Sequence, residues 1–129
     1  MTKTRLTDLQ LDLMRVLWRR GEATAAEVRD EIRDRELAPT TVATLLARLE
    51  RQAVVTRRRR GRQYVYRPRV SEREIRESMV DGLVGALFDG DAAALVGHLV
   101  SEAELEEVDL EKLRAMIDRA IERETGDER

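Results

Sequence analysis

Arginines are concentrated in one short stretch of the chain, between residues 56 and 69. Four consecutive arginines are followed by Gly61 and then by a Tyr-Val-Tyr segment. The arginines of this run are Arg57, Arg58, Arg59, Arg60, Arg62, Arg67 and Arg69. Arginine binds phosphate through paired N–H donors and keeps its charge at physiological pH. No acidic residue lies within the run, so a polyanion such as double-stranded DNA would relieve its mutual repulsion.

A second group of residues favours the same partner. Residues 39–53 predict a helix with one apolar stripe, formed by Val42, Leu45, Leu46 and Leu49. At about 100° per residue, the opposite face gathers Thr40, Thr44, Arg48 and Arg51. Such a face can reach base edges in the major groove, while the arginine run neutralises phosphates. Taken alone, the run could equally be a solvated, charged hairpin, and the helix face is what favours DNA.

Three short helices must position these residues. Thr7 and Thr24 each precede a Gln or Glu by three places, which is the capping-box pattern at a helix start. The first helix is predicted to end at Gly21 and the third to begin at Pro39. The inward positions of the first two helices are Leu9, Leu13, Val16, Leu17, Ala25, Val28 and Ile32. Three such helices, the last one amphipathic, predict a helix-turn-helix.

The hydrophobic period then changes from helical to alternating. Residues 54–56 and 63–66 predict two strands, with Arg60-Gly61-Arg62 as the turn between them. Tyr64 and Tyr66 fall on one face, and we expect at least one of them to pack on the core. A helix-turn-helix followed by a hairpin is a winged helix. The predicted fold class is therefore mainly α with a small β-hairpin wing, and the winged-helix domain covers residues 1–70.

Residues 71–124 predict a helical region. Ser71 begins a third capping box, Gly90 and Asp91 separate two helices, a short helix covers 92–99, and the last helix ends near Glu124. A fourth Ser-x-x-Glu pattern starts at Ser101. The remaining residues, 125–129, are predicted to be a disordered tail.

The apolar positions of this C-terminal region form stripes that a chain this short cannot cover. They include Leu83, Leu87, Leu95, Leu99, Leu110, Leu113, Ile117 and Ile121. So much apolar surface is rarely left in water, so we expect a second copy of the chain to cover it. The region is therefore predicted to be a helical dimerisation domain.

Charge divides along the same boundary. Residues 1–70 carry 17 Lys and Arg against 9 Asp and Glu, whereas residues 71–129 carry 7 against 17. A basic half suits a polyanion, and an acidic half would be repelled by one. This asymmetry predicts that the two halves have different partners.

The sequence also resembles the BlaI/MecI/CopY family of bacterial repressors. The resemblance covers roughly residues 4–124. It is carried by residues 6–10 (LTDLQ) with Met14, Leu17 and Trp18, by 40–49 (TTVATLLARL), by Gly61-Arg62 and by residues 64–68 (YVYRP). It implies a homodimeric transcriptional repressor that binds a palindromic operator. The DNA contacts implied by the family fall on Thr40, Thr41, Thr44, Arg48 and the wing from Arg58 to Arg62.

Two features of the sequence limit the resemblance. The copper-responsive branch of the family carries Cys-x-Cys motifs, and this chain has no cysteine. The β-lactam branch is cleaved at an Asn-Phe bond by a membrane metalloprotease, and the matching place here is His98-Leu99. The absence of cysteine excludes that mode of copper sensing, and the unmatched cleavage site gives no support to induction by that protease.

Other classes of function are disfavoured by composition. With one His, no Cys, no Gly-rich phosphate loop and no metal-ligand cluster, the sequence predicts neither an enzyme nor a bound cofactor. No apolar run approaches the ~20 residues of a membrane span, and no signal peptide opens the chain, so we expect a cytoplasmic protein without a membrane partner. The remaining alternative is a winged-helix protein-interaction module that does not bind specific DNA.

Overall fold

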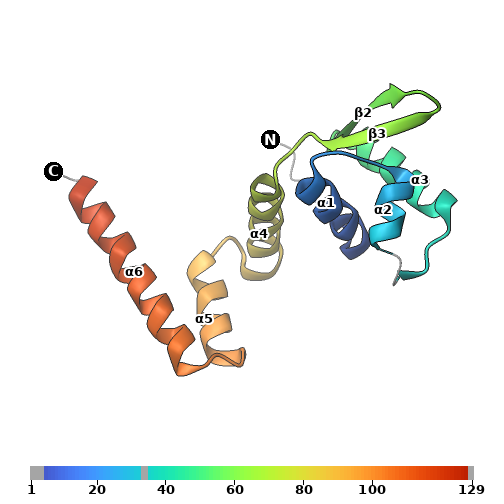
Figure 1. The fold of residues 1–129 in the computed structure, drawn as a ribbon. Coiled ribbons are helices and arrows are strands. Elements are labelled where there is room, and N and C mark those ends of the chain that lie inside the picture. The colour runs from blue at the N-terminus through green and yellow to red at the C-terminus, as the bar shows by residue number, and fades with distance from the viewer. Residues whose placement is uncertain (1–4, 33–34, 128–129) are drawn as a thin grey trace. The chain divides into compact units, whose positions relative to one another are not determined.

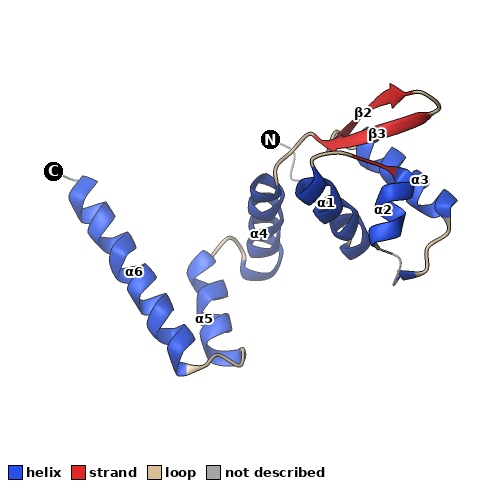
Figure 2. Ribbon diagram, in the orientation of Figure 1, coloured by secondary structure: helices blue, strands red, loops and turns tan. Residues whose placement is uncertain are grey.

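The computed structural model describes residues 5–32 and 35–127, and it is mostly helical with one small sheet (Figure 1). Its elements are α1 (Asp8–Arg20), β1 (Ala23–Thr24), α2 (Ala25–Glu31), α3 (Pro39–Arg51), β2 (Val55–Arg60), β3 (Gln63–Pro68), α4 (Glu72–Phe88), α5 (Ala92–Glu102) and α6 (Glu107–Asp127). The predicted fold class is confirmed: three helices are followed by a hairpin and then by further helices (Figure 2). The chain forms two compact units, Met1–Leu83 and Val84–Arg129.

Three of the four capping boxes are present. The Thr7 hydroxyl accepts from the Gln10 backbone N–H at 3.2 Å, and the Gln10 side chain accepts in return from the Thr7 N–H at 3.0 Å. Thr24 and Ser71 form the same reciprocal pairs with Glu27 and Glu74. Each pair satisfies two backbone donors that a helix start leaves free, so these helices begin where predicted.

The fourth Ser-x-x-Glu pattern, at Ser101, does not start a helix. Ser101 lies in the last turn of α5, and α6 begins at Glu107 instead. There the Asp109 carboxylate accepts from the Glu106 backbone N–H at 3.3 Å. The preceding helix continues through Ser101, which leaves this residue no free helix start to cap.

The core of the first unit is aliphatic and comes from all three helices and the sheet. Leu13, Met14 and Leu17 of α1, Val28 of α2, and Val42, Leu46 and Leu49 of α3 have no exposed side-chain surface. Leu45, predicted for the same α3 stripe, is partly buried at the edge of this core. The predicted apolar face of α3 therefore points inward and fixes which face is left for a partner.

The wing belongs to a three-stranded antiparallel sheet in the order β1-β3-β2. Strand β2 pairs with β3 from Val55↔Pro68 to Arg60↔Gln63. The prediction that Arg60 belongs to the turn was wrong: Arg60 is the last residue of β2, and the turn contains Gly61 and Arg62. Gly61 has φ +65°, which favours glycine at this turn position. The two-residue strand β1 was not predicted from the sequence.

The beginning of α4 packs on the winged helix. Ile75 is buried with the core of the first unit, and Met79 packs against that core. The Trp18 indole N–H donates to the Val70 carbonyl at 3.0 Å, just before α4 begins. The first compact unit therefore extends to Leu83, beyond the boundary at residue 70 that the sequence suggested.

The second unit has no comparable core. No described residue of α5 or α6 is buried. The rings of Phe88 and His98 lie 5.9 Å apart and join the end of α4 to α5. Helix α5 extends to Glu102, past the predicted end at 99. Helix α6 extends to Asp127, where disorder was predicted from residue 125, and the Thr125 hydroxyl donates to the Ile121 carbonyl at 2.9 Å. The last two residues of the predicted tail lie outside the described residues.

None of the helices described in residues 5–32 and 35–127 is by itself long and apolar enough to cross a membrane. Helices α4 and α5 meet the length and composition criteria only as a bent pair.

Candidate nucleic-acid interface

The outer face of α3 is exposed along its whole length. Thr40, Thr44, Arg48 and Arg51 are all exposed, as predicted from the spacing of the buried stripe, and Thr41, which the resemblance added, is exposed as well. Pro39 occupies the first helical turn, and Ala38 provides no side-chain cap, so the N-terminal backbone N–H groups of α3 carry no side-chain partner there. A helix that starts this way can also present its N–H groups to an anion.

The polar groups of this face are available for a partner. The Thr44 hydroxyl donates to the Thr40 carbonyl at 2.8 Å, which leaves its oxygen free to accept. In the described part of the chain, neither Arg48 nor Arg51 forms an ion pair within 4 Å. The face thus combines two uncompensated guanidinium groups with short hydroxyl side chains, which suits both phosphates and base edges.

The arginines of β2 alternate between the two faces of the sheet. The register places Arg57 and Arg59 with Tyr66 and Tyr64 on one face, and Arg58 and Arg60 on the other. The guanidinium carbon of Arg57 lies 4.1 Å from the centre of the Tyr64 ring, and that of Arg59 lies 5.8 Å from it. Both distances are within the range of cation–π attraction, so Tyr64 holds two arginines of the wing in place.

The two tyrosines have different roles. Tyr66 is buried and belongs to the core, which confirms the expectation that at least one tyrosine packs inward. Hydrogen bonding to Tyr66, followed by the charge of Glu50, raises the pKa of Arg57 above its ordinary value, although partial burial opposes this. Tyr64 remains 39% exposed on the wing.

Two arginines of the run are neutralised from within the chain. Arg57 pairs with Glu50 of α3 at 3.0 Å, and Arg58 pairs with Glu22 at 2.8 Å. The sequence shows no acidic residue in the run, and these glutamates come from elsewhere in the fold. Arg59, Arg60 and Arg62 form no ion pair within 4 Å among the described residues. The DNA-contacting residues predicted on the wing thus divide into the paired Arg58 and three uncompensated arginines.

A network of charged side chains between α1 and α2 supports the helix-turn-helix. Arg19 and Arg20 at the end of α1 pair with Glu31 of α2, and Arg20 also pairs with Glu27. The Arg20 and Arg19 hydrogen bonds lower the pKa of Glu31, and the Thr24 backbone hydrogen bond is the main cause of the lowered pKa of Glu27. The lowered pKa values reflect stabilisation of the ionised carboxylates, which pair with the arginines of α1 and so connect α2 to α1. From the sequence, Glu27 was selected only as part of a capping box, and Arg19, Arg20 and Glu31 were not selected.

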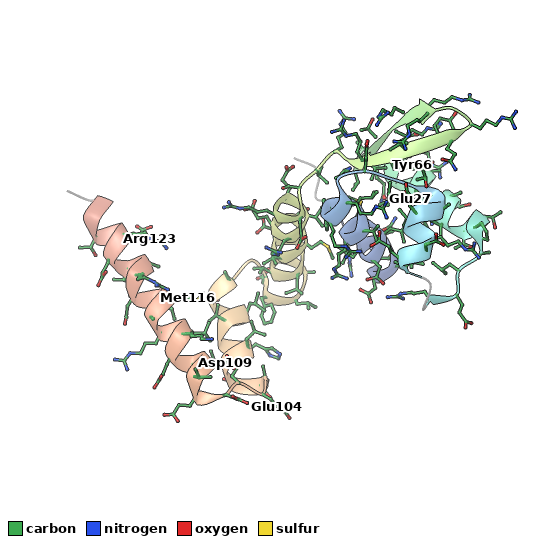
Figure 3. All side chains as sticks on the ribbon, viewed as in Figure 1. Glu27, Tyr66, Glu104, Asp109, Met116 and Arg123 are labelled. Atoms are coloured by element: carbon green, nitrogen blue, oxygen red, sulfur yellow. The ribbon has the colours of Figure 1, made fainter. Side chains whose placement is uncertain are left out.

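The predicted dimerisation residues lie in exposed apolar stripes. Leu83, Leu87, Leu99, Leu110, Ile117 and Ile121 are exposed, while Leu95 and Leu113 are partly buried. Val96, which the sequence also places in the apolar stripe, is exposed as well. Four further exposed apolar residues were not predicted, namely Val80, Val100, Val108 and Met116. Figure 3 shows Met116 on α6 with charged side chains on the same helix, including Arg123.

Within the described residues, no group of three or more His, Asp or Glu side chains is arranged to hold a metal ion.

Comparisons with known proteins identify relatives over most of the chain. The family model described as penicillinase repressor matches residues 6–119. The transcriptional regulator BlaI of Mycobacterium tuberculosis is 36% identical over 109 residues, which cover 82% of this chain and 79% of that protein. The penicillinase repressor of Staphylococcus aureus is 26% identical over 107 residues, which cover 82% of this chain and 85% of that protein.

Solved structures resemble part or most of the chain. The solution structure of the DNA-binding domain of the repressor BlaI matches with a TM-score of 0.51 and 27% identity, covering 57% of this chain and 90% of that one. A MarR family protein from Bacillus stearothermophilus matches with a TM-score of 0.50 and 23% identity over 92% of this chain, which is a likeness of fold alone.

Proposed function

The chain belongs to the penicillinase repressor family, and on this premise we propose that it is a transcriptional repressor that binds operator DNA as a homodimer. The observation that carries the proposal is the exposed Thr and Arg face of α3 beside the uncompensated arginines of the wing. Relatives named as repressors and as a transcriptional regulator, and a similar fold solved as a DNA-binding domain, support it.

In the proposed complex, α3 enters the major groove. Arg48, in the last turn of α3, is the base-reading residue, and the threonines near the start of α3 contact bases or the flanking phosphates. Arg51, at the end of α3, and the wing arginines Arg59, Arg60 and Arg62 contact phosphates. Each phosphate neutralised releases counterions, so this part of the affinity depends on salt and not on base sequence.

The proposed dimer forms through the C-terminal helices. Exposed apolar side chains lie on α5, on α6 and at the end of α4. A second copy of the chain has the same apolar surface, so the two copies can bury these side chains against each other. The residues proposed for this interface are Leu83, Leu87, Leu95, Leu99, Leu110, Leu113, Ile117 and Ile121. A two-fold dimer presents two α3 helices, so the operator is expected to be a palindrome.

Selection of bound duplexes from a random DNA library tests this proposal. The expected result is enrichment of a palindrome whose half-sites are separated by about one helical turn or a small multiple of it. Enrichment of a single, unrepeated half-site would contradict the dimer.

The rival function, a winged helix that binds only protein, predicts a different result. A gel-shift on random duplex at low salt should then show no complex, and the library should show no enrichment. The density of uncompensated arginines on α3 and the wing favours DNA over this alternative.

A further inference from the structure

Glu22 is an acidic residue that lies against the arginines of the wing. It immediately precedes β1, which pairs with β3 through Ala23↔Tyr66 and Thr24↔Val65. On the other side of β3, Val65 is paired with Arg58 of β2. The sheet order therefore brings Glu22 to Arg58, 36 residues away along the chain. The Arg58 Nη2 group donates to both carboxylate oxygens of Glu22, at 2.8 and 3.1 Å.

Several arginines surround this carboxylate. Alternation along the strands places Arg58 and Arg60 on one face of β2, and Arg67 on the same face of β3, because Arg67 is paired with Thr56. The Arg58 hydrogen bond is the main cause of the lowered pKa of Glu22; partial desolvation opposes it, and the charges of Arg58, Arg67 and Arg60 reinforce it. Glu22 is consequently ionised at neutral pH and reduces the positive charge of this face.

A phosphate that approaches Arg58 would meet this carboxylate. The Glu22 oxygens occupy the Nη2 donor, and two anions at one guanidinium repel each other. Both side chains are partly exposed, 37% for Glu22 and 49% for Arg58, so the pair can open to solvent. Arg60 and Arg62 have no ion-pair partner within the described residues, so no carboxylate oxygen lies within ion-pair distance of their guanidinium groups.

We propose that Glu22 is a positioning residue of the wing that holds Arg58 in the free protein and competes with DNA phosphate for it. The proposal rests on the proposed function. The competition weakens a phosphate contact on every duplex and leaves the base contacts of α3 unchanged. Binding to random DNA depends on phosphates alone, so the repressor relies more on its base contacts for affinity.

Glu22→Gln tests the proposal because it removes the charge and keeps the shape. The expected result is an affinity for random duplex about two- to fivefold higher at low salt, as exposed ion pairs of this kind allow. The log–log salt dependence should steepen by up to about one unit as Arg58 becomes free to neutralise a phosphate. A purely structural role of Glu22 would not steepen it. Circular dichroism melting shows whether the variant is folded.

The matched control is Glu77→Gln on α4. It makes the same change in net charge, but Glu77 is exposed and pairs with Arg73 at 3.2 Å, on an element outside the wing. Affinity and salt dependence should remain close to those of the unaltered chain. An equal gain in both variants would show a general charge effect and would overturn the proposal.

A double-mutant cycle with Arg58→Ala tests whether Glu22 acts through Arg58. In the Arg58→Ala background, Glu22→Gln should have little further effect. A gain that persists without Arg58, or weaker binding of a folded Glu22→Gln protein, would contradict the proposal. If the unaltered chain binds no duplex at all, the proposed function itself fails. If that chain binds and Glu22→Gln changes nothing, only the role of Glu22 fails.

Discussion

The two compact units of this chain differ in how far their apolar side chains are buried. In the first, Leu13, Leu46 and Leu49 are completely buried by neighbouring helices and the sheet. In the second, Leu87 is 71% exposed and Ile121 is 58% exposed, and no described side chain of α5 or α6 is buried. The first unit therefore contains its own core, whereas the described helices of the second leave most of their apolar side chains exposed.

The two units are therefore expected to obtain their stability in different ways. Isolated helices are marginal in water, because most helical stability in proteins comes from packing an apolar face. The first unit is expected to fold as a monomer. The second is expected to gain its stability on association, so its folding and the assembly of two chains should be one event.

The largest effect is expected from separating the two units. A chain that ends at Leu83 keeps Ile75 and Met79 on the core and should remain a folded monomer. Its operator affinity should fall by about two or more orders of magnitude, because two half-sites no longer act together. Sedimentation velocity and gel-shifts against operator and random duplex, at matched salt, measure both quantities. A truncated chain that stays dimeric or keeps full operator affinity would contradict the proposed dimer.

Two alanine substitutions compare a buried leucine of the first unit with an exposed leucine of the second. Leu46→Ala should reduce the free energy of unfolding of the first unit by about 2–5 kcal/mol, because it leaves a cavity in a packed core. Leu87→Ala should leave that unfolding transition within about 0.5 kcal/mol and should weaken dimerisation instead. Urea denaturation and sedimentation distinguish the two effects. Equal losses in unfolding free energy would mean that the end of α4 is also part of the core.

The Arg48→Ala variant tests whether a residue of the first unit distinguishes the bases of the operator. A direct base contact contributes about 1–3 kcal/mol of discrimination, so operator binding should weaken by more than random-duplex binding. Arg114→Ala on α6 serves as the control and should change neither. Equal weakening on both duplexes by Arg48→Ala would assign Arg48 to a phosphate.

Removing charge from the wing tests whether the arginines of the first unit neutralise phosphates. Replacing Arg59, Arg60 and Arg62 by Ala should weaken specific and random binding alike. The log–log salt slope should decrease by about one unit for each phosphate that the wing no longer neutralises. Arg58→Ala alone should have a smaller effect, since Glu22 already pairs with this side chain. An unchanged slope in the triple variant would indicate a solvated hairpin that does not touch DNA.

The smallest effect concerns the connection between α3 and the wing. Ala53 has φ +61°, a left-handed conformation that is unfavourable for a residue with a Cβ atom. Ala53→Gly should therefore stabilise the first unit by about 1 kcal/mol in urea denaturation. The same change at Ala43, exposed inside α3, should destabilise it by about 1 kcal/mol. Two changes of equal sign would refute the role of backbone conformation.

The parts of the fold that depend on local chemistry were predictable. Thr7 and Thr24 cap their helices because the reciprocal partner lies only three residues away, and the α3 stripe follows from helical periodicity. Strand β1 has only two residues and forms by pairing with β3, which is distant in the sequence. No local sequence pattern therefore predicts this strand. The division at Leu83 depends on Ile75 packing on distant residues of the core, which the sequence does not reveal.

The candidate site, like the fold, was predictable only where it depends on local sequence. Exposure of Thr40, Thr44 and Arg48 follows from the buried stripe on the opposite face of α3. The neutralisation of Arg57 and Arg58 does not, because Glu50 and Glu22 reach them only through the tertiary fold. A charge run read along the chain therefore overestimates the free positive charge of the folded wing.

The hydrogen bond between Trp18 and the Val70 carbonyl has a practical consequence. Trp18 is the single tryptophan of the chain, so all indole fluorescence arises at the place where α1 meets the segment that leads into α4. The emission wavelength of an indole depends on the polarity of its surroundings and on its exposure to solvent. The Trp18 ring is partly buried. The protein therefore contains its own spectroscopic probe of the junction between the winged helix and α4, and a shift in emission on adding operator would measure any rearrangement there without a label.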